Sequence, residues 1–182
     1  MDTPGPRVHR PSAVLFDRDG TLVVDVPYNG DPTAVVPMPG AVEAVARVRA
    51  AGLPTAVVSN QSGIARGIVG ADRVAAVNAR VDALFGAFDA WCVCPHGPGD
   101  GCECRKPRPG LVLEAARRLG VAPADVVVIG DIGADVAAAA AAGARGILVP
   151  TPVTRPEEVA SAAEVAADLA AAVEAALAGG PT

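Results

Sequence analysis

Aspartates stand at the ends of two apolar runs of the sequence, where a folded chain would hold them rigidly. Asp17 directly follows the run 12–16, Asp19 lies two residues further on, and Asp131 follows the run 125–129 after one glycine. Paired carboxylates suit a nucleophile with a general acid–base partner. Carboxylate oxygens are also the ligands that Mg²⁺ prefers. These positions therefore predict a reactive centre that can hold a divalent cation.

Three further polar residues add to this chemistry. Lys106 supplies a positive charge, while Ser59 and Asn60, which follow another apolar run, supply hydrogen-bond donors. An in-line nucleophile, a metal ion and a cation that neutralises phosphoryl oxygens are the parts that phosphoryl transfer requires. The sequence therefore predicts a phosphoryl-transfer site.

The cysteines form a second constellation, because all four of them lie close to one histidine. Cys94 and His96 are two residues apart, and so are Cys102 and Cys104, with a Gly/Pro-rich segment between the pairs. In an extended chain, side chains two residues apart point to the same side. We expect these four residues to hold a structural Zn²⁺, with Cys92 excluded as a small core residue. The alternative is a buried thiol cluster or a redox pair.

The elements that position these residues are short apolar runs separated by helical patterns. The runs lack regular polar alternation, which is typical of parallel strands buried on both faces. They cover residues 12–16, 54–58, 88–93, 125–129 and 145–149. Strands that alternate with helices predict a doubly wound, Rossmann-like α/β sheet whose ligands bind at the carboxyl ends of the strands.

Helices are expected in the segments between and after these runs. Glycines at 52, 120 and 143 stand where a helix C-cap is expected. The expected helices cover residues 40–52, 71–86, 109–120, 134–143 and 161–178. A chain of 182 residues can bury one core, so we predict a single domain over 12–178, with flexible tails at 1–11 and 179–182.

The charge balance argues against nucleic acid as a partner. The chain has 20 Asp and Glu against 15 Lys and Arg, a net charge of −5, whereas phosphate backbones need a basic face. No apolar leader segment is evident, and no apolar stretch approaches the ~18 residues of a membrane span. We expect a cytoplasmic protein without membrane contact, a compartment in which clustered cysteines bind metal more often than they form disulfides.

Each motif can also be interpreted as purely structural, with no functional role. The segment DRDGT could be a simple turn after a strand, GDIGAD a helix start with a capping aspartate, and SNQSG a polar loop. Arg108 reads as a solvated charge near a helix start, and His9 as a solvated tail residue. The joint position of the motifs at strand ends favours an active site.

In this order and spacing, the motifs DRDGT, SNQSG, CRKP and GDIGAD resemble those of the haloacid dehalogenase (HAD) superfamily of phosphohydrolases. The resemblance covers about residues 12–149. It implies that Asp17 forms an aspartyl-phosphate, and that Asp19 protonates the leaving group and then activates water. It also implies that Ser59 and Lys106 hold the phosphoryl group.

The same resemblance implies a catalytic Mg²⁺. Its ligands would be Asp17, Asp131 and the backbone carbonyl of Asp19, and Asp135 would support them. Many HAD enzymes carry an inserted cap domain, but residues 22–40 are too few for one and residues 64–104 are largely accounted for by a helix, a strand and the cysteine loop. We therefore expect a capless, monomeric form that acts on a small phosphorylated sugar.

Two capless groups with a cysteine loop resemble the chain. The phrases SNQSGIARG and DRDGTLVVDVPY are similar to D-glycero-D-manno-heptose 1,7-bisphosphate 7-phosphatases, whereas the five residues between His96 and Cys102 are similar to histidinol-phosphate phosphatases. We favour conversion of heptose 1,7-bisphosphate to heptose 1-phosphate and phosphate. A zinc-knuckle binding module is the alternative from another class, but it leaves the aspartates unexplained. The resemblance to the heptose enzymes implies a sugar site lined by Asp25, Tyr28, Ser59, Asn60, Gln61, Ser62 and Arg105.

Overall fold

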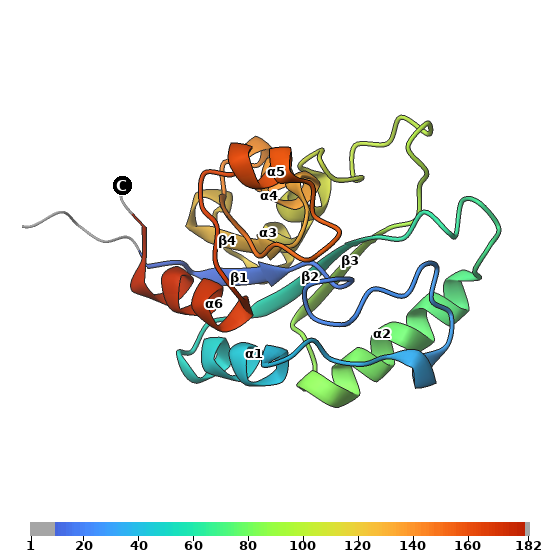
Figure 1. The fold of residues 1–182 in the computed structure, drawn as a ribbon, viewed down its shortest axis with the longest axis horizontal. Coiled ribbons are helices and arrows are strands. Elements are labelled where there is room, and N and C mark those ends of the chain that lie inside the picture. The colour runs from blue at the N-terminus through green and yellow to red at the C-terminus, as the bar shows by residue number, and fades with distance from the viewer. Residues whose placement is uncertain (1–9, 181–182) are drawn as a thin grey trace, which may run out of the picture.

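A five-stranded parallel sheet forms the centre of the structure, a computed structural model that describes residues 10–180 (Figure 1). Its strands are β1 (Ala13–Phe16), β2 (Thr55–Asn60), β3 (Ala90–Cys94), β4 (Val126–Gly130) and β5 (Arg145–Leu148). They lie in the order β3-β2-β1-β4-β5. All five expected strands are present, and β2 extends two residues beyond its expected end, so that Ser59 and Asn60 belong to the strand.

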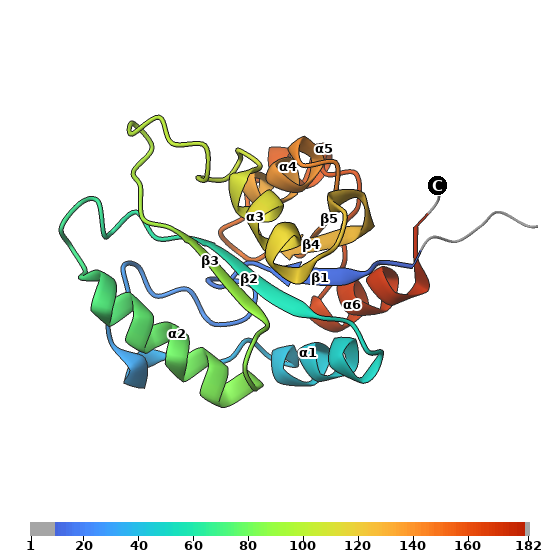
Figure 2. The same ribbon diagram turned by 180° about the vertical axis from the view of Figure 1, so that it is seen from behind.

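Helices cover both faces of this sheet, which confirms the predicted α/β class. The helices are α1 (Ala41–Ala50), α2 (Ala71–Phe85), α3 (Gly110–Leu119), α4 (Gly133–Ala141), α5 (Pro156–Ser161) and α6 (Leu169–Ala178), with short 3₁₀ turns at Pro32–Ala34 and Pro123–Asp125. Figures 1 and 2 show α1, α2 and α6 on one side of the sheet and α3, α4 and α5 on the other.

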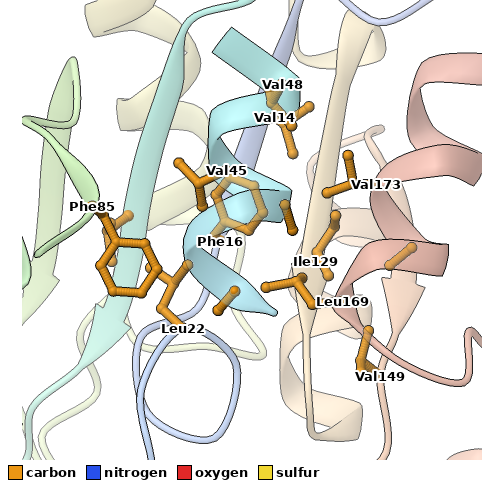
Figure 3. Close-up of a cluster of buried hydrophobic side chains, with 14 of the residues drawn as sticks. Val14, Phe16, Leu22, Val45, Val48, Phe85, Ile129, Val149, Leu169 and Val173 are labelled. Atoms are coloured by element: carbon orange, nitrogen blue, oxygen red, sulfur yellow. The ribbon is translucent and has the colours of Figure 1, made fainter. Parts of the chain in front are cut away.

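The strands bury alternate side chains against these two helical layers. In β1, Val14 and Phe16 belong to the cluster packed against α1, α2 and α6, and Ala13 and Leu15 belong to the cluster packed against α3 and α4. Figure 3 shows part of the first cluster, in which Val45 of α1 lies near the ring of Phe16. Burying a side chain of this size contributes about 2 kcal/mol, so β1 is anchored from both sides. Such an anchored strand ends directly at Asp17.

The expected helix over residues 161–178 is wrong for its first part. The chain between α5 and α6 runs extended beside β5, where Leu148 N donates to Glu164 O at 2.9 Å and Ala166 N donates to Leu148 O at 2.8 Å. Edge strands carry unpaired main-chain groups, and pairing them outweighs the helix propensity of the alanines in this segment. The helix restarts only where the side chain of Asp168 accepts a hydrogen bond from Ala171 N and caps α6.

The segments where related folds insert a cap domain are short here. Residues 22–40 double back on themselves, with Val24 N donating to Val36 O and Met38 N donating to Leu22 O, both at 2.9 Å. Their only helical element is the 3₁₀ turn at Pro32–Ala34. Within residues 10–180, therefore, neither this segment nor the turn after β2 forms a second domain.

The order of the strands fixes where a ligand can bind. The chain winds from β1 to β2 and β3 in one direction and continues to β4 and β5 on the other side of β1. Ligands of such sheets bind beyond the carboxyl ends of the strands at the point where the order reverses. Here that point lies between β1 and β4, which end directly before Asp17 and Asp131.

Parts of the predicted tails cannot be compared with the structure. The described residues do not include residues 1–9 of the expected N-terminal tail, among them His9, or residues 181–182. In the described part of the chain, no helix combines the length and the apolar character that crossing a membrane would require.

Candidate active site

Asp17 lies at the centre of the candidate active site. Its main-chain N–H donates to Ile129 O of the neighbouring strand β4 at 2.9 Å, so the residue is held at the mouth of the sheet by the backbone as well as by the strand. Asp17 is 7% exposed. Burial raises the pKa of its carboxyl group well above the ordinary value, and the opposing charge of Lys106 offsets this only in part.

Lys106 is the only lysine of the chain, and its ammonium is buried in this site. Its Nζ lies 2.6 Å from Oδ1 of Asp17, 2.6 Å from Oδ1 of Asp135 and 2.7 Å from the carbonyl oxygen of Val58. Burial lowers the pKa of Lys106, but the charges of Asp135 and Asp17 outweigh it and the net pKa lies above the ordinary value. The site therefore holds a charged ammonium beside the expected nucleophile.

Asn60 fixes the main chain at Lys106. Its Nδ2 donates to Lys106 O at 3.1 Å, and its Oδ1 accepts from Lys106 N at 3.1 Å. The two ends of the Asn60 amide thus clamp a residue 46 positions away along the chain. Sequence reasoning expected Asn60 to contact a sugar and missed this supporting contact, which no local pattern reveals.

Three carboxylates converge where a divalent cation could bind. One ligand atom each of Asp17, Asp131 and Asp135 lies within 4.8 Å of the other two. Burial, followed by the negative charge of Asp135, raises the pKa of Asp131 to about 7. These three buried carboxylates share the single ammonium of Lys106, so the negative charge is in excess. A hard cation with oxygen ligands would balance it. The carboxylate of Asp135 contacts Lys106 with one oxygen and accepts from Ile132 N with the other.

Asp19 is held beside this cluster by two donor side chains. Arg18 Nε donates to Asp19 Oδ1 at 3.0 Å and an Arg18 NH₂ group donates to Asp19 Oδ2 at 2.9 Å. Gln61 Nε2 lies 2.8 Å from Asp19 Oδ2 and 2.8 Å from Ser59 Oγ. Ser59, expected to bind phosphate, is thus connected with Asp19 through Gln61. The role of Arg18 was missed, although a basic residue between the two aspartates was visible in the sequence.

A cavity of 320 Å³ opens over these groups. It is lined by Asp17, Asp19, Asp131 and Asp135, by Lys106, and by Asp25, Tyr28, Asn60, Gln61 and Ser62 among the residues expected to contact the sugar. Arg105 is not part of this lining: it lies along an adjoining hollow of 210 Å³, and its guanidinium donates to His96 O at 3.2 Å. Lys106 lines both hollows, so Arg105 faces the neighbouring space.

The cysteine loop gathers its donor atoms around one point. Cys94 Sγ lies 3.7 Å from Cys102 Sγ and 3.1 Å from Cys104 Sγ, and His96 Nδ1 lies 3.6 Å and 3.3 Å from the sulfurs of Cys94 and Cys104. Ligands of a tetrahedral Zn²⁺ at roughly 2.3 Å for sulfur and 2.0 Å for nitrogen would lie about 3.8 Å and 3.5 Å apart. The donor set is therefore close to the size of a zinc site. Cys92 is absent from this group and packs in the core beside α3.

Comparison with known proteins matches both the sequence and the fold. D-glycero-beta-D-manno-heptose-1,7-bisphosphate 7-phosphatase of Pseudomonas putida is 40% identical over 143 residues, which cover 76% of this chain and 82% of the relative. The protein of the same name from Mesorhizobium japonicum is 42% identical over 159 residues, covering 80% of this chain and 73% of the relative. The crystal structure of D,D-heptose 1,7-bisphosphate phosphatase from B. bronchiseptica, complexed with magnesium and phosphate, has a TM-score of 0.80 at 36% identity and covers 90% of this chain and 96% of that chain.

The fold and the cluster of aspartates around Lys106 define a HAD-like phosphatase. In agreement, the family model Hydrolase_like, described as HAD-hydrolase-like, matches residues 103–176. The chain belongs to the D-glycero-β-D-manno-heptose-1,7-bisphosphate 7-phosphatase family. The family resemblance carried by the four sequence motifs is thereby confirmed.

Proposed function

We propose that the protein removes the 7-phosphate of D-glycero-D-manno-heptose 1,7-bisphosphate, leaving heptose 1-phosphate and inorganic phosphate, and that it does so with Mg²⁺. The observation that carries the proposal is the contact of Lys106 with Asp17 beside three convergent carboxylates at the switch point of the sheet. The sugar is inferred from the names of the similar enzymes. Asp25, Tyr28, Gln61 and Ser62 would contact it from the cavity wall.

The reaction proceeds in two displacements at phosphorus. In the first, a carboxylate oxygen of Asp17 attacks the phosphorus, the bond from phosphorus to the sugar oxygen breaks, and Asp19 gives that oxygen a proton. In the second, water attacks the aspartyl-phosphate, Asp19 takes the proton from the water, and the bond between phosphorus and Asp17 breaks. Phosphate leaves, and both aspartates return to their initial forms.

Lys106 and Ser59 would hold the phosphoryl group during both displacements. The ammonium lies beside Asp17, at the position where negative charge accumulates on the phosphoryl oxygens. Ser59 Oγ already contacts Gln61, which in turn contacts Asp19. A phosphoryl group in this site would therefore meet the ammonium at the cavity wall, whereas Ser59 is 1% exposed and does not itself line the cavity.

Asp17, Asp131 and the main-chain carbonyl of Asp19 are the proposed ligands of Mg²⁺, and Asp135 supports them. The excess of buried negative charge and the raised pKa of Asp131 are the features that fit a bound cation. Mg²⁺, when bound, neutralises phosphoryl oxygens and the nucleophile so that the two can approach. The carboxylates themselves would orient the ion through their fixed places after β1 and β4.

Zn²⁺ is the second proposed metal, with a structural role. Its ligands would be Cys94, His96, Cys102 and Cys104, whose donor atoms lie within 4.8 Å of one another. The loop ends at Arg105 and Lys106, so a metal that ties the loop would also hold the catalytic lysine in place. A site with four protein ligands has no open position, which suits a structural rather than a catalytic ion.

Histidinol phosphate is the second candidate substrate, because five residues separate His96 from Cys102, the spacing that resembles histidinol-phosphate phosphatases. A zinc-knuckle module is disfavoured, since it gives no reason for the buried aspartates. Cytoplasmic location and a monomeric state remain predictions.

A side-by-side measurement of kcat/KM on both anomers of heptose 1,7-bisphosphate and on histidinol phosphate tests the proposal. We expect a heptose anomer to be preferred, and a preference for histidinol phosphate would contradict the assignment. Asp17→Asn is expected to abolish Mg²⁺-dependent phosphate release. Asp72→Asn, which changes an exposed aspartate on α2, is the matched control and is expected to leave it intact.

A further inference from the structure

Arg18 is the largest of the fully buried side chains in the described part of the protein, with 1% of its surface exposed. It lies between Asp17 and Asp19 in the turn after β1. A buried guanidinium loses its hydration, which is unfavourable unless several acceptors replace the water. An apolar residue at this position would avoid that loss, so the presence of an arginine calls for a reason.

The hydrogen-bond acceptors of Arg18 show which residue it holds in place. Two of its nitrogens form a fork on the carboxylate of Asp19, at 3.0 Å and 2.9 Å. The third, NH1, donates to Oδ1 of Asn78 on α2 at 2.7 Å. Arg18 thereby ties the carboxylate of Asp19 to a helix 60 positions further along the chain, and a fork of this kind fixes both the place and the plane of a carboxylate.

The side chain of Asp19 is partly exposed, so its orientation depends on the residues that hold it. Its side chain is 24% exposed, whereas Arg18 beneath it is buried. Gln61 adds one further contact, to Oδ2. Because an acid–base residue must meet the leaving oxygen and later the attacking water in hydrogen-bond geometry, its orientation bears directly on both displacements.

We propose that Arg18, anchored by Asn78, is a positioning residue that holds Asp19 for proton transfer to the leaving oxygen. The guanidinium also stabilises the carboxylate that remains after the proton has left, because its charge-assisted hydrogen bonds are stronger to a carboxylate than to a carboxylic acid. The inference rests on the proposed phosphatase reaction with Asp19 as acid. It adds two residues, one buried in the turn and one on α2, to the machinery of that reaction.

Leaving groups of different basicity separate this role from a structural one. A sugar alkoxide must be protonated as it departs, while p-nitrophenolate departs without a proton. Single-turnover rates of phosphoryl transfer to the enzyme would be measured for heptose 1,7-bisphosphate and p-nitrophenyl phosphate. In Arg18→Lys, which keeps the charge but loses the fork, we expect about a 100-fold fall with the sugar and less than about a threefold fall with the aryl phosphate.

A second variant and a double substitution keep the test decisive. Asn78→Ala leaves Arg18 in place but removes its anchor, and should lower the sugar rate about tenfold with the aryl rate retained. In the background of Asp19→Asn, Arg18→Lys should have no further effect on the sugar rate. Arg80→Lys, two residues from Asn78 on the exposed side of α2, is the control and should behave as wild type.

Equal falls with both substrates would overturn the proposal, because they would indicate a general structural defect. Additive effects of Arg18→Lys and Asp19→Asn would overturn it too. If wild-type protein released phosphate from neither substrate, the proposed function itself would fail, a result distinct from the loss of selectivity between the two leaving groups.

Discussion

Gly20 and Asp131 lie against each other across the mouth of the sheet. Gly20 follows Asp19 with φ at +84°, a conformation that side chains disfavour. A Cβ atom built on Gly20 would overlap the carboxylate of Asp131, which lies after β4. The turn after β1 and the carboxylate of Asp131 therefore fit together only while residue 20 has no side chain.

Gly20→Ala is accordingly expected to impair metal binding as well as folding. The added methyl group must displace Asp131, so we expect at least a tenfold rise in the Mg²⁺ concentration that gives half-maximal activity. Gly52→Ala is the matched control, because Gly52 has φ at +78° but no neighbouring atom within 4 Å of the added Cβ. It should lose about 1 kcal/mol of stability through backbone strain and keep its Mg²⁺ dependence. Equal Mg²⁺ dependence in the two variants would contradict the role assigned to Gly20.

Removal of the ammonium of Lys106 should be costly for folding and for catalysis. Lys106→Met keeps an unbranched chain as long as the aliphatic part of lysine but leaves Asp17 and Asp135 without their cation. Breaking a buried ion pair on one side destabilises proteins by about 3–5 kcal/mol, and loss of one charge-stabilising donor lowers kcat by roughly 100- to 1,000-fold. Urea unfolding and phosphate release would measure the two effects.

The pH dependence of the stability lost in Lys106→Met distinguishes the loss of charge from the loss of packing. At low pH the two carboxyl groups can take up protons and no longer need the ammonium, so the difference in unfolding free energy between Lys106→Met and wild type should shrink as the pH falls. A difference that does not change with pH would indicate lost packing rather than lost charge.

Much of the fold could be predicted because its signals are local. Apolar runs of strand length and glycines after helices marked the strands and most of the helices, and Asp17 and Asp131 stood out because each follows a buried run. The segment between α5 and α6 could not be predicted in this way. Its pairing with β5 depends on where a distant strand edge lies, which an alanine-rich pattern does not reveal.

The supporting contacts of the site were hidden for the same reason. Asn60 contacts Lys106 across 46 residues, and Arg18 contacts Asn78 across 60. Residue type and motif spacing indicate which side chains can react, but the orientation of each depends on partners from other elements. Arg105 illustrates the difference, since its neighbour Lys106 lines the cavity while Arg105 turns to the carbonyl of His96.

Zinc removal is expected to destabilise the protein selectively. Cys94→Ser should lower the zinc content below one ion per chain and reduce stability by at least about 3 kcal/mol, because the proposed metal would hold two ends of a loop that contains no helix or strand of its own. Cys92→Ala, two residues earlier in the same strand, is the matched control. It should retain its zinc and lose only about 1 kcal/mol from a smaller core side chain. Metal analysis and thermal unfolding measure both, and equal zinc loss in the two variants would refute the ligand set.

The pKa of Asp131 predicts how stability and Mg²⁺ binding depend on pH. Burial and the charge of Asp135 raise this pKa from 3.8 to about 7. A folded-state pKa above the unfolded one means that the contribution of Asp131 to stability is present in full below about pH 4 and is lost as the pH rises through about 7. The metal-free protein should therefore lose this contribution between those values.

Mg²⁺ binds the deprotonated carboxylate, so its stabilising effect should grow over the same pH range. We expect Mg²⁺ to raise the unfolding temperature more at about pH 8 than at about pH 6, and to release up to about one proton per site near pH 6. Calorimetric titration in buffers of different ionisation enthalpy measures that proton. Asp131→Asn should remove both the proton release and the pH dependence of the Mg²⁺ effect. If the proton release persisted in this variant, the titrating group would be another carboxylate of the cluster, and Asp131 would not be the residue that couples Mg²⁺ binding to pH.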